Sequence, residues 1–186
     1  MTRNKPLFLV FLLAACTPEE QAPPPVRVHF EDVAQAAGLT LHNVCGSPDK
    51  RYIVEAKGGS LAAFDYDSDG YQDLFVVDGT RIDGAPEGAG NRLFRNEAAP
   101  SPSSSTASST RTFRDVTAAA GLVHSAWGMG CAVGDVDEDG SPDLYVAYWG
   151  RDLYYHNEGD GTFTERAATA GLGSEAWGTS AAFGDL

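Results

Sequence analysis

The stretch TFRDVTAAAGLVHSAWGMGCAVGDV, residues 112–136, recurs as TFTERAATAGLGSEAWGTSAAFGDL at residues 162–186. The offset is 50 residues without a gap, and it aligns Trp127 with Trp177. An earlier copy begins at HFEDVAQAAGLT, residues 29–40, and is lengthened by insertions. Self-similarity at such a period is typical of repeat architectures, in which each copy is one supersecondary unit.

Each copy is predicted to hold about four short strands and one brief helical turn. The turn ends at the glycine of an AGL motif, since glycine commonly follows the last helical residue. Two segments are apolar at consecutive positions, which predicts strands buried on both faces. These segments are DLFVV at residues 73–77 and DLYVAYW at residues 143–149. Small-residue strands are predicted to precede them, with the third copy beginning such a strand at residues 178–183.

The predicted fold class is all-β, with β-propeller blades of about four antiparallel strands joined by short helical turns. Sheets buried on both faces need a neighbour on each side, and a propeller supplies this by radial repetition of four-stranded sheets. The repeats occupy residues 28–186, with copies at about 28–111, 112–161 and 162–186. This corresponds to an incomplete ring of two blades and the start of a third. A β-solenoid is the alternative fold, although solenoid repeats are usually shorter.

Residues 1–15 are predicted to form a signal peptide. Arg3 and Lys5 precede the apolar run LFLVFLLAA, residues 7–15. A basic start followed by a short apolar run is typical of secretory signals. The run is shorter than the roughly 20 residues that a membrane-spanning helix needs.

The string LAAC, residues 13–16, resembles the lipobox of bacterial lipoproteins. The resemblance implies lipid attachment at Cys16 and, because Thr17 follows it, an exported lipoprotein of the cell envelope in the outer membrane. The alternative is an ordinary secretory signal in which Cys16 has no role. Residues 16–27 are polar and proline-rich, which predicts an extended tether.

The chain is strongly acidic, with a formal net charge of −13. Without residues 1–15, which carry two cations, the charge becomes 11 minus 26, or −15. Such a charge argues against a nucleic-acid partner, and against anionic lipid bound through a basic face. Nine of the 26 acidic residues lie in two short loops, which indicates a counter-cation there.

The two acidic loops read DYDSDGYQD at residues 65–73 and DVDEDGSPD at residues 135–143. Carboxylates at positions 1, 3, 5 and 9, a glycine at position 6 and a backbone carbonyl at position 7 form an all-oxygen ligand set that suits Ca²⁺. Mg²⁺ prefers more water, and zinc prefers histidine and cysteine. The candidate metal ligands are Asp65, Asp67, Asp69, Tyr71, Asp73, Asp135, Asp137, Asp139, Ser141 and Asp143, with Asp185 opening a third loop.

An EF-hand is excluded because it needs a bidentate glutamate at position 12 and flanking helices. Position 12 is Val76 in the first loop and Val146 in the second, and both lie in predicted strands. The alternative to a metal site is a solvated acidic turn, although two loops in register with the repeat argue against it.

These loops resemble the FG-GAP/VCBS-type repeats of integrin α-subunit propellers. The motifs NRLFRNE (residues 91–97), FRDVTAAAGL (residues 113–122) and LYYHNEGDGTF (residues 153–163) are more narrowly similar to bacterial relatives of cartilage acidic protein, the ASPIC/UnbV-associated group. That resemblance implies a lipoprotein start, a propeller and a C-terminal ASPIC/UnbV module, which this sequence lacks.

The sequence contains no nucleophile motif and no phosphate-binding loop, so the chain is predicted not to be an enzyme and no catalytic residue is assigned. Its four histidines are scattered and are predicted to be surface or packing residues. Cys131 aligns with Ala181, which predicts a small core residue rather than a disulfide with Cys45. The expected function is a calcium-binding surface interaction or adhesion module for a protein or glycan. The alternative is the propeller part of an exported polysaccharide-active enzyme.

Overall fold

The computed structural model describes residues 27–99 and 111–184. The predicted lipidation at Cys16, most of the predicted tether and the candidate ligand Asp185 lie outside these ranges. The described residues from 32 onward form one compact unit. Among the described residues, no helix is both long and apolar enough to cross a membrane.

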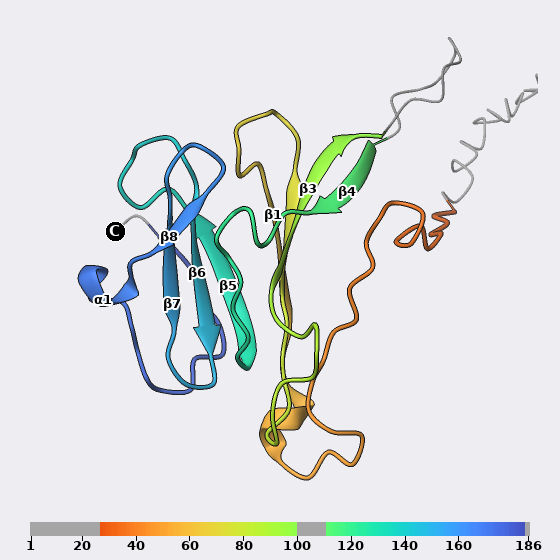
Figure 1. The fold of residues 1–186 in the computed structure, drawn as a ribbon, viewed down its shortest axis with the longest axis vertical. Coiled ribbons are helices and arrows are strands. Elements are labelled where there is room, and N and C mark those ends of the chain that lie inside the picture. The colour runs from red at the N-terminus through yellow and green to blue at the C-terminus, as the bar shows by residue number, and fades with distance from the viewer. Residues whose placement is uncertain (1–26, 100–110, 185–186) are drawn as a thin grey trace, which may run out of the picture. The chain divides into compact units, whose positions relative to one another are not determined.

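The unit is built from two four-stranded antiparallel sheets, each in sequence order (Figure 1). The first sheet contains β1 (Ser60–Phe64), β2 (Asp73–Val77), β3 (Arg92–Ala98) and β4 (Arg111–Asp115). The second contains β5 (Gly128–Gly134), β6 (Asp143–Tyr148), β7 (Leu153–Asn157) and β8 (Phe163–Glu165). The only helical elements of the described residues are η1 (Ile53–Ala56) and α1 (Ala167–Ala170). The predicted all-β class with four-stranded propeller blades is confirmed.

The fourth strand of each sheet comes from the beginning of the next sequence copy. Phe113 of β4 lies opposite Asn96 of β3, and Phe163 of β8 lies opposite Asn157 of β7. Each sheet is therefore completed by the repeat that follows it. This arrangement ties consecutive copies together through a full ladder of backbone hydrogen bonds.

The glycine-ended turns are present, although only α1 is long enough to be a helix. Gly121 has a φ of +76°, and its N–H donates to the carbonyl oxygen of Ala118. The Phe163 N–H in turn donates to the Ala120 carbonyl at 2.9 Å. A Cβ at Gly121 would lie 2.9 Å from the Phe163 carbonyl oxygen, so a side chain would prevent the turn from approaching the next strand.

The main core lies where side chains of the two sheets pack against each other. Strand β1 lies beside β5, and the Gly128 N–H donates to the Asp78 carbonyl at 3.1 Å. Because the two sheets lie this close together, their apolar side chains form one continuous layer between them. Its largest fully buried members are Phe75, Val77, Leu93, Leu122, Leu144, Val146 and Tyr148.

The two apolar strands differ in burial. Strand β6 is buried along most of its length, whereas β2 alternates between buried and half-buried residues. The prediction that both strands are buried on both faces is therefore wrong for β2. Within the described residues, the segment after Trp177 packs next to β5, so that the second sheet has a neighbour beyond the first sheet.

The predicted strand at residues 178–183 is not formed. Trp177 makes only an isolated bridge to Trp149, and the Gly178 N–H donates to the Tyr148 carbonyl at 3.1 Å. This bond repeats the one from Gly128 to Asp78. The third copy therefore begins to pack as the second does. It lacks strand geometry because no strand in the described part of the chain forms a ladder with it.

The aromatic side chains at the end of β6 and along β7 are mostly buried. Tyr148, Tyr154 and Tyr155 are buried, and Trp149 remains about half exposed. Cys45 and Cys131 are both free, and Cys131 packs against the main core.

Candidate metal centres

Both acidic loops connect the first two strands of their sheets. Residues 65–72 join β1 to β2, and residues 135–142 join β5 to β6. In each sheet, the residue before the loop is paired with the aspartate that ends it, as Phe64 with Asp73 and Gly134 with Asp143. The hairpin pairing therefore brings position 9 back beside position 1, as a ligand cage requires.

The two loops share one backbone conformation. The carboxylate of Asp65 accepts hydrogen bonds from the backbone N–H groups of Asp69 and Gly70, at 3.0 and 2.8 Å. The carboxylate of Asp135 accepts the equivalent bonds from Asp139 and Gly140, at 3.1 and 2.8 Å. Position 1 therefore curls the loop even before any ion binds.

The glycine at position 6 is required by the turn. Gly70 and Gly140 have φ values of +88° and +91°, in the left-handed region that favours glycine. The position-5 carboxylates of Asp69 and Asp139 accept hydrogen bonds from the N–H groups of Tyr71 and Ser141. The proposed use of the Tyr71 and Ser141 carbonyls as ligands stays a prediction.

The position-9 aspartates are fully buried and tie the loop to the third strand. Asp73 accepts hydrogen bonds from the backbone N–H groups of Tyr66 and Asn96, at 3.1 and 2.7 Å. Asp143 accepts from the N–H groups of Val136 and Asn157 and from the Tyr154 hydroxyl. Burial raises the pKa of Asp73. These two carboxylates therefore connect the backbone of each loop to the third strand of its sheet.

In the first loop, the carboxylates of Asp65, Asp67 and Asp73 converge. One oxygen from each lies within 4.8 Å of the others. The Oδ1 atom of Asp67 is buried without a hydrogen-bond partner among the described residues, and burial raises the pKa of Asp67. An oxygen-only group with an unsatisfied carboxylate fits a hard cation such as Ca²⁺.

An arginine lies over this first loop. The Nη2 atom of Arg95, on β3, is 2.8 Å from Asp67 Oδ2 and 3.5 Å from Asp69 Oδ2. The guanidinium thus supplies one positive charge to the loop from within the protein.

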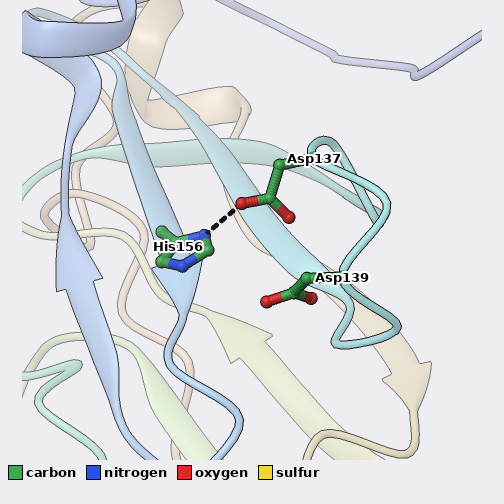
Figure 2. Close-up of side chains that lie close together, drawn as sticks. All are labelled: Asp137, Asp139 and His156. Atoms are coloured by element: carbon green, nitrogen blue, oxygen red, sulfur yellow. Dashed lines mark ion pairs between the residues drawn. The ribbon is translucent and has the colours of Figure 1, made fainter.

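The second loop brings together a different set of groups. Ligand atoms of Asp137, Asp139 and His156 lie within 4.8 Å of one another. His156 lies on β7, and both aspartates project from the loop toward it (Figure 2). Asp135 and Asp143 are outside this group. Asp185, the opening residue of the third loop, lies beyond the described residues.

All four histidines were predicted to be surface or packing residues; His156 is buried, and it also faces the second loop, which the prediction did not anticipate. The signal was present in the repeat, because FRN at residues 94–96 aligns with YHN at residues 155–157. The strand pairings confirm this alignment, since Leu74 pairs with Phe94 and Leu144 with Tyr155. His156 and Arg95 therefore occupy the same position facing the two loops.

Comparison with known families identifies a repeat family whose boundaries coincide with the acidic loops. The FG-GAP-like repeat family matches residues 65–146 and 135–186. Both matches begin at the first aspartate of an acidic loop, so the family repeat and the loop period coincide. No curated protein matches the chain. Two overlapping matches that together run from residue 65 to residue 186 place the chain in the FG-GAP-like repeat family.

Proposed function

We propose that the chain is a non-catalytic, calcium-stabilised interaction module that meets a protein or glycan partner at the cell surface. FG-GAP-like repeats support a propeller-like interaction module. The observation that carries the calcium proposal is the convergence of carboxylates in the first loop, with one buried oxygen of Asp67 unsatisfied. The net charge of −13 argues against a nucleic-acid partner.

Calcium has a physical reason to bind there. Carboxylates held a few ångströms apart repel each other by about 1 kcal/mol per pair even in water-like surroundings. Burial raises the pKa of Asp67 and Asp73, because the buried carboxylates lose part of their hydration. A divalent ion would replace the lost water with direct ligand bonds. The bound ion would then rigidify the hairpin and the surface around it.

Titration calorimetry of the full chain tests the calcium proposal. We expect wild type to bind Ca²⁺ with a dissociation constant of about 10⁻⁴ to 10⁻³ M, which is typical of extracellular modules. The double variant Asp67→Ala plus Asp137→Ala removes one carboxylate from each loop, and we expect its binding heat to disappear.

The matched control for this experiment is Asp83→Ala plus Glu87→Ala. Both residues are exposed and lie outside the loops, so this variant loses the same two charges without changing either site. Its calcium heat should equal that of wild type. An unchanged heat in the Asp67 and Asp137 double variant would refute calcium binding by these loops.

We propose that Cys16 carries the lipid anchor of an outer-membrane lipoprotein. The support is the LAAC string after a short apolar run with a basic start. Cells fed labelled palmitate should label wild type and Cys45→Ser equally, and Cys16→Ser should carry no label. Equal labelling of Cys16→Ser would contradict the proposal.

We further propose that the chain belongs with the bacterial cartilage acidic protein-like, ASPIC/UnbV-associated proteins. The support is the group of motifs at residues 91–97, 113–122 and 153–163. Sequencing the gene through its stop codon tests this proposal. A downstream ASPIC/UnbV segment would support it, and a downstream polysaccharide-cleaving domain would contradict both the grouping and the non-catalytic role.

A further inference from the structure

His156 is a buried imidazole that points into the second acidic loop. Its side chain is 8 % exposed, and Nδ1 has no hydrogen-bond partner among the described residues. Nδ1 is 3.5 Å from Asp137 Oδ2, the contact drawn in Figure 2, and 3.2 Å from Asp143 Oδ1. A buried polar atom without a partner is destabilising, so this nitrogen is expected to have a ligand.

Asp143 does not satisfy this nitrogen. Its Oδ1 accepts the Asn157 N–H at 2.8 Å, and its Oδ2 accepts the Tyr154 hydroxyl at 2.8 Å. The contact from His156 to Oδ1 lacks hydrogen-bond geometry. The carboxylates of Asp137 and Asp139 instead point toward the imidazole from the exposed side of the loop (Figure 2).

The spacing of these three groups suits a small divalent metal ion. Their ligand atoms lie within 4.8 Å of one another. A tetrahedral ion with bonds of about 2.1 Å holds its ligands about 3.4 Å apart, so small side-chain rotations would close the site. The exposed side of the loop leaves the remaining coordination positions to water.

The first loop provides the contrast within the same chain. Arg95 occupies the position of His156, and its Nη2 is 2.8 Å from Asp67 Oδ2. A guanidinium carries five donors and no acceptor, so it cannot coordinate a metal. It places a fixed positive charge where His156 offers a nitrogen lone pair.

We propose that the second loop is a mixed imidazole–carboxylate site for a first-row transition-metal dication, with His156, Asp137 and Asp139 as its protein ligands. Imidazole suits zinc, copper, iron and nickel, whereas Ca²⁺ and Mg²⁺ take oxygen ligands. Arg95 offers no nitrogen lone pair, so the first loop lacks the imidazole ligand of such a site. The inference rests on the proposed cation-binding role of the loops and assigns the second loop a different ion.

Titration of the full chain with Zn²⁺ at neutral pH tests the assignment. We expect His156→Gln to weaken Zn²⁺ binding about tenfold or more, since even residues that only orient metal ligands contribute tenfold to a hundredfold. His42→Gln, at an exposed histidine elsewhere in the chain, should bind Zn²⁺ as wild type does.

A variant that gains binding keeps the test decisive even if His156→Gln fails to fold. We expect Arg95→His to add a second Zn²⁺ event, and Arg95→Gln, which removes the charge without adding a nitrogen ligand, to add none. The assignment is overturned if His156→Gln and wild type bind Zn²⁺ equally, or if folded Arg95→His gains no Zn²⁺ event beyond that of Arg95→Gln.

Parallel Ca²⁺ titrations separate this inference from the proposed function. No Ca²⁺ heat, together with Zn²⁺ binding that depends on His156, would reject the calcium role and keep the transition-metal site. Ca²⁺ heat that depends on Asp67 and Asp137, together with Zn²⁺ binding that does not depend on His156, would keep the calcium role and reject the transition-metal site.

Discussion

Trp127→Ala is expected to lower the free energy of unfolding by about 3–5 kcal/mol, the range for large aromatic side chains removed from a core. Trp127 is 2 % exposed and packs against Val54, Met129 and Cys45. Its Nε1 donates to the Lys57 carbonyl at 3.0 Å, so the substitution also removes that hydrogen bond. Equilibrium unfolding in urea measures the loss.

Trp177→Ala is the matched control because Trp177 occupies the same repeat position. Trp177 is 43 % exposed, and its backbone makes only the isolated bridge to Trp149. We expect this substitution to cost about 1 kcal/mol or less, as is usual for largely exposed sites. Equal losses for Trp127→Ala and Trp177→Ala would show that the third copy packs as deeply as the second, contrary to the structure.

Asp143→Ala is expected to lower the free energy of unfolding by about 3 kcal/mol or more, even when a chelator removes divalent ions. The substitution deprives three donors of their acceptor: the N–H groups of Val136 and Asn157 and the Tyr154 hydroxyl. Each buried donor left unpaired costs about 1–3 kcal/mol. Urea unfolding in the presence of the chelator measures this structural role separately from any metal.

Two variants calibrate the Asp143 result. Asp143→Asn keeps one acceptor oxygen, so its loss should be smaller than that of Asp143→Ala. Asp137→Ala removes a half-exposed carboxylate of the same loop, and its stability in chelator should stay close to wild type. If Asp143→Ala were as stable as Asp137→Ala under these conditions, Asp143 would have no structural role beyond that of a loop ligand.

Local patterns in the sequence led to the correct class of fold. An aligned 50-residue period, consecutive apolar positions and glycine-ended turns each follow from local physical rules about strands, turns and repeats. Two antiparallel four-stranded sheets were therefore predictable without coordinates. The curl of the acidic loops was predictable for the same reason, because Gly70 and Gly140 occupy the position that needs a positive φ.

The burial of individual residues could not be predicted from the repeat, because aligned residues have different neighbours in the folded structure. Trp127 and Trp177 are equivalent in sequence, but the other side chains of the core surround only Trp127. Strands β2 and β6 have similar apolar patterns, but β6 is the more completely buried. Burial depends on the segments that pack across a strand, and these are distant in sequence.

The composition of each candidate metal site was likewise decided by the tertiary structure. The sequence identified the aspartates of both loops as one motif, and by itself it predicted a cation site in each loop. Arg95 and His156 lie on third strands, 22 and 13 residues after the last aspartates of their loops, yet antiparallel pairing brings each one over its loop. Because the charge and ligand atoms that face a loop come from that neighbouring strand, only the folded sheet distinguishes the site beside Arg95 from the site beside His156.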